Sequence, residues 1–251
     1  MKGLKGANII VTGGAQGIGA AICRRLGEEG SAVAIFDLAE AAAKETAEAI
    51  NEAGGRAFAY SVDITDYAAV EAAVTQFEAD AGPVDGLVNN AGWDQATNFV
   101  KADRAIWDKV VQINLYGPMN MTHVVLQGMS ARGKGRIVSL ASDAGRVGSS
   151  GEAVYSACKG GVVALMKTVA REVARTGITL NTVCPGPTDT ALLAAFDDSG
   201  KLQAALEKAI PMRRLGQPED YPGIVAFLLS DDAAFITGQT LSVSGGLTMH
   251  G

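Results

Sequence analysis

The sequence predicts an α/β protein with a doubly wound parallel sheet of about seven strands and helices on both faces. Short apolar segments of strand length alternate with longer helix-like segments along residues 1–251. Strands that are apolar throughout are typical of parallel sheets, because helices cover both faces of such sheets. The chain has 31 glycines against 7 prolines and no repeat, which fits the many tight turns of repeated βαβ units.

The individual elements follow from this alternation. The predicted strands cover residues 7–11, 32–36, 57–62, 84–88, 136–140, 179–183 and 240–243. The predicted helices cover residues 17–29, 40–53, 67–81, 103–129, 152–175, 191–209 and 218–229. Glycine or Gly-Pro pairs end the second and third helices, at residues 54–55 and 82–83. Because no linker or low-complexity segment divides the chain, one domain over residues 1–251 is predicted.

Composition and charge narrow the class of protein. Apolar residues make up 48% and charged residues 19%, which is typical of a globular chain. The net charge is −6 and there is no basic run, so no nucleic-acid partner is expected. No stretch approaches about 18 consecutive apolar residues, so no membrane partner is expected.

Cysteine and histidine usage points away from a metal site. Cys23, Cys158 and Cys184 are widely separated and form no CxxC pair, which favours reduced thiols and a cytoplasmic location. The two histidines are His123, in a helix-like stretch, and His250, next to the C-terminus. With so few histidine ligands, no metal site is predicted.

A glycine-rich turn follows the first predicted strand. Residues 12–19 read TGGAQGIG and place Gly13, Gly17 and Gly19 in the spacing GxxxGxG, with Gln16 and Ile18 between them. Glycines allow a tight turn and close approach of a ligand to the backbone, and a helix N-terminus offers amides to a diphosphate. The motif therefore indicates a dinucleotide site, although by itself it also fits a structural turn.

Two acidic residues at strand ends refine this prediction. Asp37 ends the second predicted strand, 18 residues after Gly19, where a carboxylate can accept hydrogen bonds from the ribose hydroxyls of NAD. It would repel the 2′-phosphate of NADP. No Arg or Lys lies in the glycine turn, where Gln16 sits, and none directly follows Asp37, so NAD is favoured. Asp63, after the third strand, could meet the adenine ring with its neighbour Ile64. Either aspartate could instead cap the helix that follows it.

Tyr155, Lys159 and Ser142 form a candidate chemical site. Tyr155 and Lys159 are four residues apart, so a helix places them on one face. A nearby ammonium is expected to lower the pKa of the phenol, so that Tyr155 could exchange a proton with a hydroxyl or carbonyl. Ser142 follows the fifth predicted strand, at the sheet edge where such folds bind ligands. Its hydroxyl could hold the substrate oxygen.

The chain as a whole resembles the short-chain dehydrogenase/reductase family. The resemblance rests on TGGAQGIG at 12–19, Asp37, Asp63, NNAG at 89–92, Asn114, Ser142, YSACK at 155–159, PGPTDT at 185–190, and the late RLGQPED and ITGQTLSVSGG stretches. It implies a single Rossmann-like domain, with a substrate lid at about residues 190–216, and a homotetramer.

The resemblance also implies roles for the matching residues. Tyr155 would be the general acid/base, with Lys159 as modulator of its pKa and a ligand of the nicotinamide ribose. Ser142 would stabilise the reacting oxygen, and Asn114 would anchor a water in a proton relay. The segment Asn89, Asn90, Ala91 and Gly92 would pack beside the adenosine side of the cofactor. The segment containing Pro185, Gly186, Thr188 and Thr190 would border the nicotinamide.

The substrate is less constrained by the sequence. The segments around Ser142, NNAGWD and the C-terminus are similar to the dehydrogenases of 2-hydroxycyclohexanecarboxyl-CoA. The hypothesis is an NAD-dependent enzyme that oxidises a 3-hydroxyacyl-CoA-type substrate. The alternatives are a 3-oxoacyl-acyl-carrier-protein or 3-oxoacyl-CoA reductase, which usually uses NADPH, and a cyclic alcohol or sugar dehydrogenase. Trp93 could wall the site, with lid residues Leu192, Leu193 and Phe196 as apolar lining, and Arg146 or Arg213–Arg214 could meet CoA phosphates or be surface charges.

Overall fold

The computed structural model describes residues 1–194 and 200–249 and contains a seven-stranded sheet. Every pair of neighbouring strands is parallel, and the strand order is β3-β2-β1-β4-β5-β6-β7. The strands are β1 (Asn8–Thr12), β2 (Ala32–Asp37), β3 (Arg56–Ser61), β4 (Gly86–Asn89), β5 (Gly135–Leu140), β6 (Ile178–Pro185) and β7 (Thr240–Val243). The predicted doubly wound sheet is confirmed, because the order reverses direction between β1 and β4.

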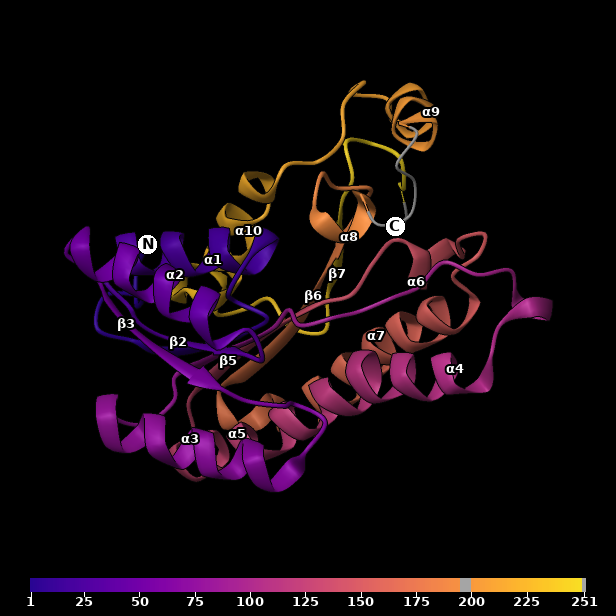
Figure 1. Ribbon diagram of the computed structural model, residues 1–251. Helices are drawn as coiled ribbons and strands as arrows, with labels where there is room; N and C mark the ends of the chain where they lie inside the picture. The colour runs from indigo at the N-terminus through magenta and orange to yellow at the C-terminus, as the bar shows by residue number, and fades with distance from the viewer. Residues whose placement is uncertain (195–199, 250–251) are drawn as a thin grey trace.

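Helices cover both faces of this sheet, so the molecule has three layers (Figure 1). One layer contains α1 (Gly17–Glu28), α2 (Glu40–Glu52) and α10 (Pro222–Leu229). The opposite layer contains α3 (Tyr67–Ala81), α4 (Arg104–Val111), α5 (Gly117–Arg132) and α7 (Ala153–Val173). The shorter elements are η1 (Phe99–Lys101), α6 (Ala144–Val147), η3 (Ala174–Thr176), α8 (Ala191–Ala194), α9 (Lys201–Ala209), η4 (Pro218–Asp220) and η5 (Asp231–Ala233).

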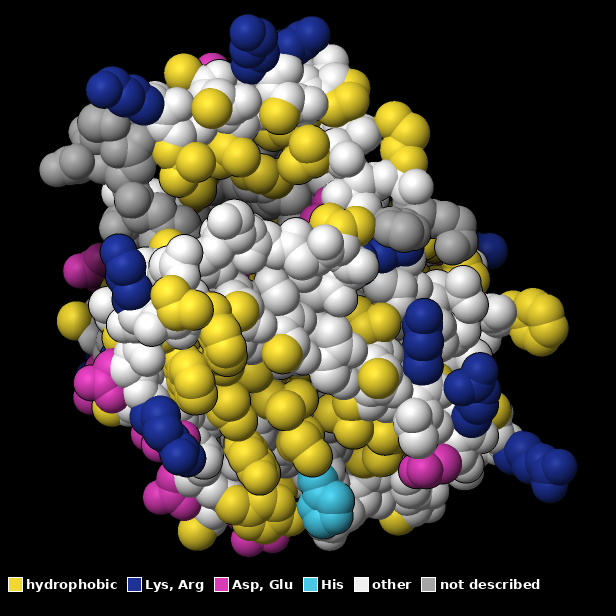
Figure 2. Space-filling model, turned by 90° about the vertical axis from the view of Figure 1, so that its right-hand side faces the viewer, with side chains coloured by type: hydrophobic (Ala, Val, Ile, Leu, Met, Phe, Trp, Pro, Cys, Tyr) yellow, Lys and Arg dark blue, Asp and Glu magenta, His cyan; other side chains and the backbone are white. Residues whose placement is uncertain are grey.

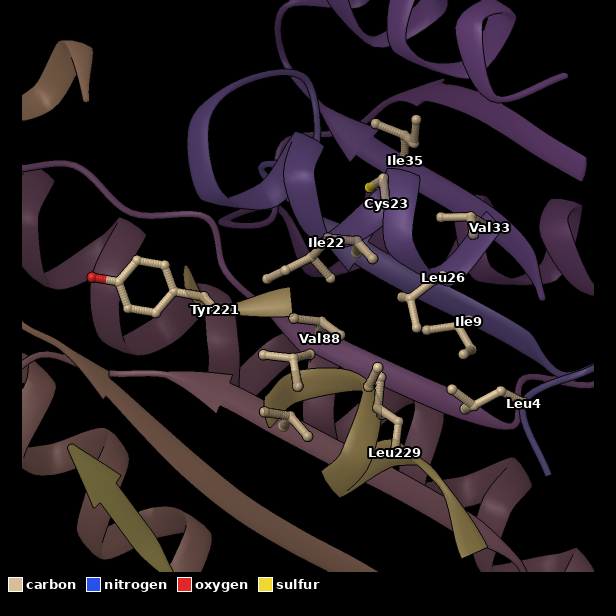
Figure 3. Packing of buried hydrophobic residues seen from close by; sticks show 14 of the residues in the cluster. Leu4, Ile9, Ile22, Cys23, Leu26, Val33, Ile35, Val88, Tyr221 and Leu229 are labelled. Carbon is tan, nitrogen blue, oxygen red and sulfur yellow. The ribbon is translucent and has the colours of Figure 1, made fainter. Parts of the chain in front are cut away.

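Side chains of the central strands alternate between the two layers. In β1, Ile9 and Val11 pack toward α1 and α10, whereas Ile10 packs against the cluster formed with α3, α5 and α7. This follows from the period of two along a strand. Figure 3 shows the first cluster, in which Tyr221 lies at the margin with its hydroxyl pointing away from the hydrophobic side chains. That hydroxyl hydrogen-bonds to the hydroxyl of Thr188, so α10 is tied to the loop after β6.

Two predicted helices differ from the observed ones. The helix expected over residues 103–129 is divided by a π-helical turn, η2 (Gln112–Tyr116), between α4 and α5. The physical reason is local: Pro118 lacks a backbone N–H, and the Asn114 side chain donates to the carbonyl oxygen of Val110 at 2.9 Å. The helix expected over residues 191–209 appears as α8 and α9, and Phe196 lies outside the described residues.

The loops after the strands gather at one edge of the sheet, and this edge positions the site. The loop after β1, the end of β2 and the loops after β4, β5 and β6 all open there, next to α8 and α9. Within residues 1–194 and 200–249, no helix combines the length and apolar character needed to cross a membrane.

Candidate active site

A large cleft opens at the carboxyl ends of the strands. Its volume is about 1060 Å³. Figure 2 shows the molecule hollowed below a projecting lobe, whose underside presents hydrophobic side chains. Leu193, Leu202 and Leu206 from the predicted lid region line the cleft. So do all residues predicted to bind a cofactor: Gly13, Gln16, Gly17, Ile18, Gly19, Asp37, Asp63, Ile64, Asn90, Ala91, Gly92, Tyr155, Lys159, Pro185, Gly186, Thr188 and Thr190.

The glycine turn forms a cradle that side chains would fill. Gly13 and Gly17 have positive φ angles of 64° and 54°, which L side chains rarely adopt. A Cβ at Gly19 would lie 2.0 Å from the carbonyl oxygen of Gly13, and one at Gly13 would lie 2.7 Å from Cα of Ala91. The Gln16 side chain makes no capping bond to α1, so the first-turn amides stay available to an anion. The cradle therefore fits the diphosphate of a dinucleotide.

The Asp37 carboxylate is held in place by the backbone. Its Oδ2 accepts from the amide of Ala15 at 3.0 Å, and its Oδ1 accepts from the amide of Ala39 at 2.9 Å. Each carboxylate oxygen keeps a free lone pair for a ribose hydroxyl. The nearby Lys44 is paired with Glu40, so it does not neutralise Asp37.

Asp63 lines the same cleft but is engaged locally. Its Oδ1 accepts from the amide and the hydroxyl of Thr65, at 2.9 and 2.7 Å. The cap of α3 is Asp66, whose side chain accepts from the amides of Ala68 and Ala69. The alternative interpretation of Asp63 as the cap of the next helix is therefore wrong, because the cap lies three residues later.

Lys159 lies at the floor of the cleft on α7. It is 3% exposed, and its Nζ donates to the carbonyl oxygen of Leu140 at 2.9 Å. Its Nζ lies 5.5 Å from the centroid of the Tyr155 ring. Burial lowers the pKa of Lys159 to about 8, because the ammonium has lost most of its hydration. The group is thus close to half charged near pH 8.

Tyr155 and Ser142 meet in the same part of the cleft. The two side chains share a hydrogen bond, and the Ser142 hydroxyl also accepts from the amide of Ala144 at 3.1 Å. Burial raises the pKa of Tyr155, and the carboxylates of Glu152 and Asp94 raise it further, while the bond to Ser142 opposes them. The expectation that a neighbouring ammonium lowers this pKa is therefore not met.

Asn114 is the one predicted catalytic residue that does not line the cleft. It is fully buried in the π-helical turn, where its Nδ2 donates to the carbonyl oxygen of Trp93 at 2.6 Å and its Oδ1 accepts from the amide of Trp93 at 3.2 Å. A Cβ at Gly92 would lie 3.0 Å from Asn114 Oδ1 and 3.5 Å from Lys159 Nζ. Asn114 thus lies behind Gly92, close to Lys159, and fixes the loop after β4.

The structure also brings in residues that the sequence patterns did not single out. Glu152 lines the cleft, and Asp94 lies beside it. Glu152 is three residues before Tyr155, so helical spacing could have indicated it. Asp94 lies in a separate loop, and no local sequence pattern indicates that it belongs to the site. Trp93 lines the cleft as predicted, with Lys109 Nζ 3.8 Å from its ring centroid.

The arginines considered for CoA phosphates do not line the cleft. Arg146 donates to the hydroxyl of Ser242 at 2.8 Å, and that hydroxyl donates to Asp143. Arg214 forms two hydrogen bonds to Asp220, at 2.6 and 2.8 Å, and Arg213 donates to the carbonyl oxygen of Lys208. Each of the three arginines therefore has a hydrogen-bond partner within the chain.

No cluster of three metal-binding side chains occurs in the part of the chain that the structure describes. The three cysteines are buried and free. His123 hydrogen-bonds through Nδ1 to the hydroxyl of Tyr67 at 2.8 Å, away from the cleft.

Replacing Lys159 by methionine should stabilise the fold at neutral pH. The pKa of about 8 lies below the usual value of 10.5, so at pH 7 the folded chain bears the cost of a buried charge. After subtraction of the lost hydrogen bond to Leu140, the free energy of unfolding should rise by about 2 kcal/mol. Denaturant unfolding at pH 7 measures this.

The sign of the effect follows from linkage. The unfolded chain binds more protons than the folded chain between pH 8 and about 10.5, so the gain from the methionine shrinks over that range. Lys167→Met, on an exposed part of α7, is the matched control and should change stability by less than about 0.5 kcal/mol. A methionine variant less stable than wild type at pH 7 would contradict the buried-charge argument.

Comparison with known proteins identifies relatives of nearly full length. The family model described as enoyl-(acyl carrier protein) reductase matches residues 13–248. An acetoacetyl-CoA reductase of Rhizobium meliloti is 43% identical over 94% of this chain and 96% of its own. The 2-(S)-hydroxypropyl-CoM dehydrogenase 3 of Xanthobacter autotrophicus is 39% identical over 98% of both chains. The 3-oxoacyl-acyl-carrier-protein reductase FabG of Escherichia coli is 35% identical, again over 98% of both chains.

A solved structure is also similar to the whole chain. A crystal structure of an actinorhodin polyketide ketoreductase variant with NADPH superposes with a TM-score of 0.94. It is 36% identical, and the match covers 100% of both chains.

Proposed function

Because this chain belongs to the short-chain dehydrogenase/reductase family of oxidoreductases, we propose that it uses NAD to interconvert a secondary alcohol and a ketone. The proposed substrate is of the 3-hydroxyacyl-CoA type, such as 2-hydroxycyclohexanecarboxyl-CoA. The observation that carries the proposal is the cleft itself, which joins Tyr155, Ser142 and Lys159 at one part to the carboxylate of Asp37 at another.

The residues around the cleft suit a bound NAD. The amides of the glycine turn would hold the diphosphate and Asp37 the ribose hydroxyls near the adenine, with Asn90 to Gly92 beside the adenosine. Lys159 would contact the nicotinamide ribose, and the segment from Pro185 to Thr190 would border the nicotinamide. When bound, NAD would supply the acceptor for a hydride.

The chain's own residues would handle the proton and the oxygen. In the oxidative direction Tyr155, as phenolate, takes the proton of the substrate hydroxyl. The Ser142 hydroxyl donates a hydrogen bond to the reacting oxygen and holds it against Tyr155. In the reductive direction the same phenol returns the proton to the carbonyl oxygen. Lys159 places its ammonium beside both groups, and Asn114 keeps the loop at Gly92 in position behind it.

Two alternatives remain within the family. The names of the relatives favour a 3-oxoacyl-CoA or 3-oxoacyl-acyl-carrier-protein reductase. The carboxylates of Asp94 and Glu152 also favour the protonated phenol that ketone reduction needs. A cyclic alcohol or sugar dehydrogenase is the second alternative. The homotetramer that the family resemblance implies and the cytoplasmic location are further proposals, the first of which light scattering tests directly.

The test measures initial NADH formation from NAD with paired substrates. Cyclic and linear 3-hydroxyacyl-CoA esters are compared with their free acids and with simple secondary alcohols, and acetoacetyl-CoA is offered with NADH or NADPH. We expect kcat/KM for the thioesters to exceed that for the free acids by at least about 100-fold, equivalent to about 2.7 kcal/mol. Turnover of free alcohols alone would refute the thioester assignment, and faster acetoacetyl-CoA reduction with NADPH would favour the reductase.

A further inference from the structure

A pair of carboxyl groups lies beside Tyr155 that the proposed mechanism does not use. Asp94 belongs to the loop after β4 and is 7% exposed. Glu152 immediately precedes α7 and lines the cleft. Their carboxyl groups are close enough to share a hydrogen bond when one of them is protonated. Asp94, Glu152 and Tyr155 line the same small cavity, and the negative charges of both carboxylates raise the pKa of Tyr155.

The surroundings of Asp94 disfavour its charged form. Its Oδ2 is buried and faces no hydrogen-bond donor among the described residues. It borders a small cavity of about 20 Å³ behind Tyr155, and Trp107, whose Nε1 is also unpaired among those residues, lines the same cavity. Burial and the neighbouring Glu152 raise the pKa of Asp94 to about 6. Asp94 thus gains its negative charge beside Glu152 as the pH rises through about 6.

Tyr155 faces titratable groups from three elements and their flanking loops. Lys159 comes from its own helix, Glu152 from the residue that precedes this helix, Asp94 from the loop after β4, and Cys184 from β6. The Cys184 thiol is neutral near pH 8, because burial and Asp143 raise its pKa to about 11 although Arg146 opposes them. Lys159 is the cation that opposes these negative charges. Burial lowers the pKa of Lys159 to about 8, so a smaller fraction of it is charged near that pH. Among these groups, the carboxylates of Glu152 and Asp94 raise the pKa of Tyr155 most strongly.

We propose that Asp94 and Glu152 are positioning residues that hold Tyr155 in its protonated form and so set the pH range of each direction of the reaction. The inference rests on the proposed role of Tyr155. A phenolate next to two carboxylates is disfavoured by like-charge repulsion. Alcohol oxidation needs the phenolate and ketone reduction needs the phenol. The pair therefore raises the pH at which alcohol oxidation begins. It also extends the pH range of ketone reduction to higher pH.

The experiment records the pH dependence of kcat/KM for Glu152→Gln and Asp94→Asn. Both changes keep the shape of the side chain and remove one negative charge. We expect the acidic limb of the oxidation profile to move to lower pH by about one unit in each variant, and the basic limb of the reduction profile to move with it. Glu152→Asp keeps the negative charge, so the acidic limb of its oxidation profile should stay close to the pH of the wild-type limb.

The matched control is Glu172→Gln, which removes the same charge from an exposed position at the far end of α7. Its profile should coincide with that of the wild type. A second readout needs no turnover. Ultraviolet titration of the Tyr155 phenol, isolated by subtracting the spectrum of Tyr155→Phe, should show ionisation at lower pH in Glu152→Gln than in the wild type.

The outcomes separate this inference from the proposed function. If thioesters are not substrates but the limb still shifts with a simple secondary alcohol, the inference stands and the thioester assignment fails. If the limb and the phenol titration of a folded Glu152→Gln variant stay within about 0.3 pH unit of wild type, the inference is overturned whatever the substrate. Thermal melting identifies a variant that fails to fold. Should Asp94→Asn unfold, Glu152→Gln carries the test alone.

Discussion

Replacing Tyr155 by phenylalanine should lower kcat for alcohol oxidation by about a thousandfold or more. The change removes one oxygen, which is the proposed acceptor of the substrate proton, and a positioned acid/base contributes typically 10²–10⁴-fold. Ser142 would lose one hydrogen-bond partner, so stability should change by only about 1 kcal/mol. NADH absorbance measures kcat, and NADH fluorescence on binding should report an intact cofactor site.

Tyr60→Phe is the matched control for this change. Its hydroxyl donates to Asp80 at 2.7 Å, Tyr60 belongs to the edge strand β3, and it does not line the cleft. Tyr60→Phe removes the same atom at a position outside the candidate site, so its kcat should stay within about twofold of wild type. If Tyr155→Phe kept more than a tenth of wild-type kcat, Tyr155 would not be the acid/base. The protein would then use another proton acceptor.

Replacing Asp37 by asparagine should change the choice of cofactor. We expect the wild type to prefer NAD over NADP by at least about 100-fold in kcat/KM, and the variant to lose about 10- to 100-fold of that preference. The reason is the fixed carboxylate, which two backbone amides hold at the cleft and which would repel a 2′-phosphate. Asparagine keeps the shape and one acceptor oxygen but removes the charge.

Asp63→Asn tests whether the effect belongs to Asp37 or to negative charge in general. Asp63 lines the same cleft and bears the same charge, but its Oδ1 is bound to Thr65. Its replacement should leave the NAD-to-NADP ratio within about threefold of wild type. An unchanged ratio in Asp37→Asn, or efficient NADPH use by the wild type, would contradict the assignment of Asp37 and favour the reductase alternative.

The sequence alone was sufficient for the architecture and for most of the cleft. Strand and helix periodicity is a local property, so the seven strands and their alternation with helices could be predicted. The glycine turn could also be predicted, because positive φ angles and close backbone approaches require glycine at Gly13 and Gly19. The spacing of Tyr155 and Lys159 placed them on one helical face because both lie on the same element.

Only the tertiary structure decided the charge environment of these residues. Asp94 and Glu152 are 58 positions apart in the chain, and no local pattern indicates that their carboxyl groups meet beside Tyr155. The direction of the Tyr155 pKa shift follows from burial and from these charges, so a sequence argument based on Lys159 alone predicted the opposite sign. Likewise, the hydrogen bonds of Asn114 to Trp93 and those of Arg146 to its partners depend on contacts between distant segments. Periodicity and backbone conformation are encoded locally, whereas desolvation and through-space charge interactions exist only once the chain has folded.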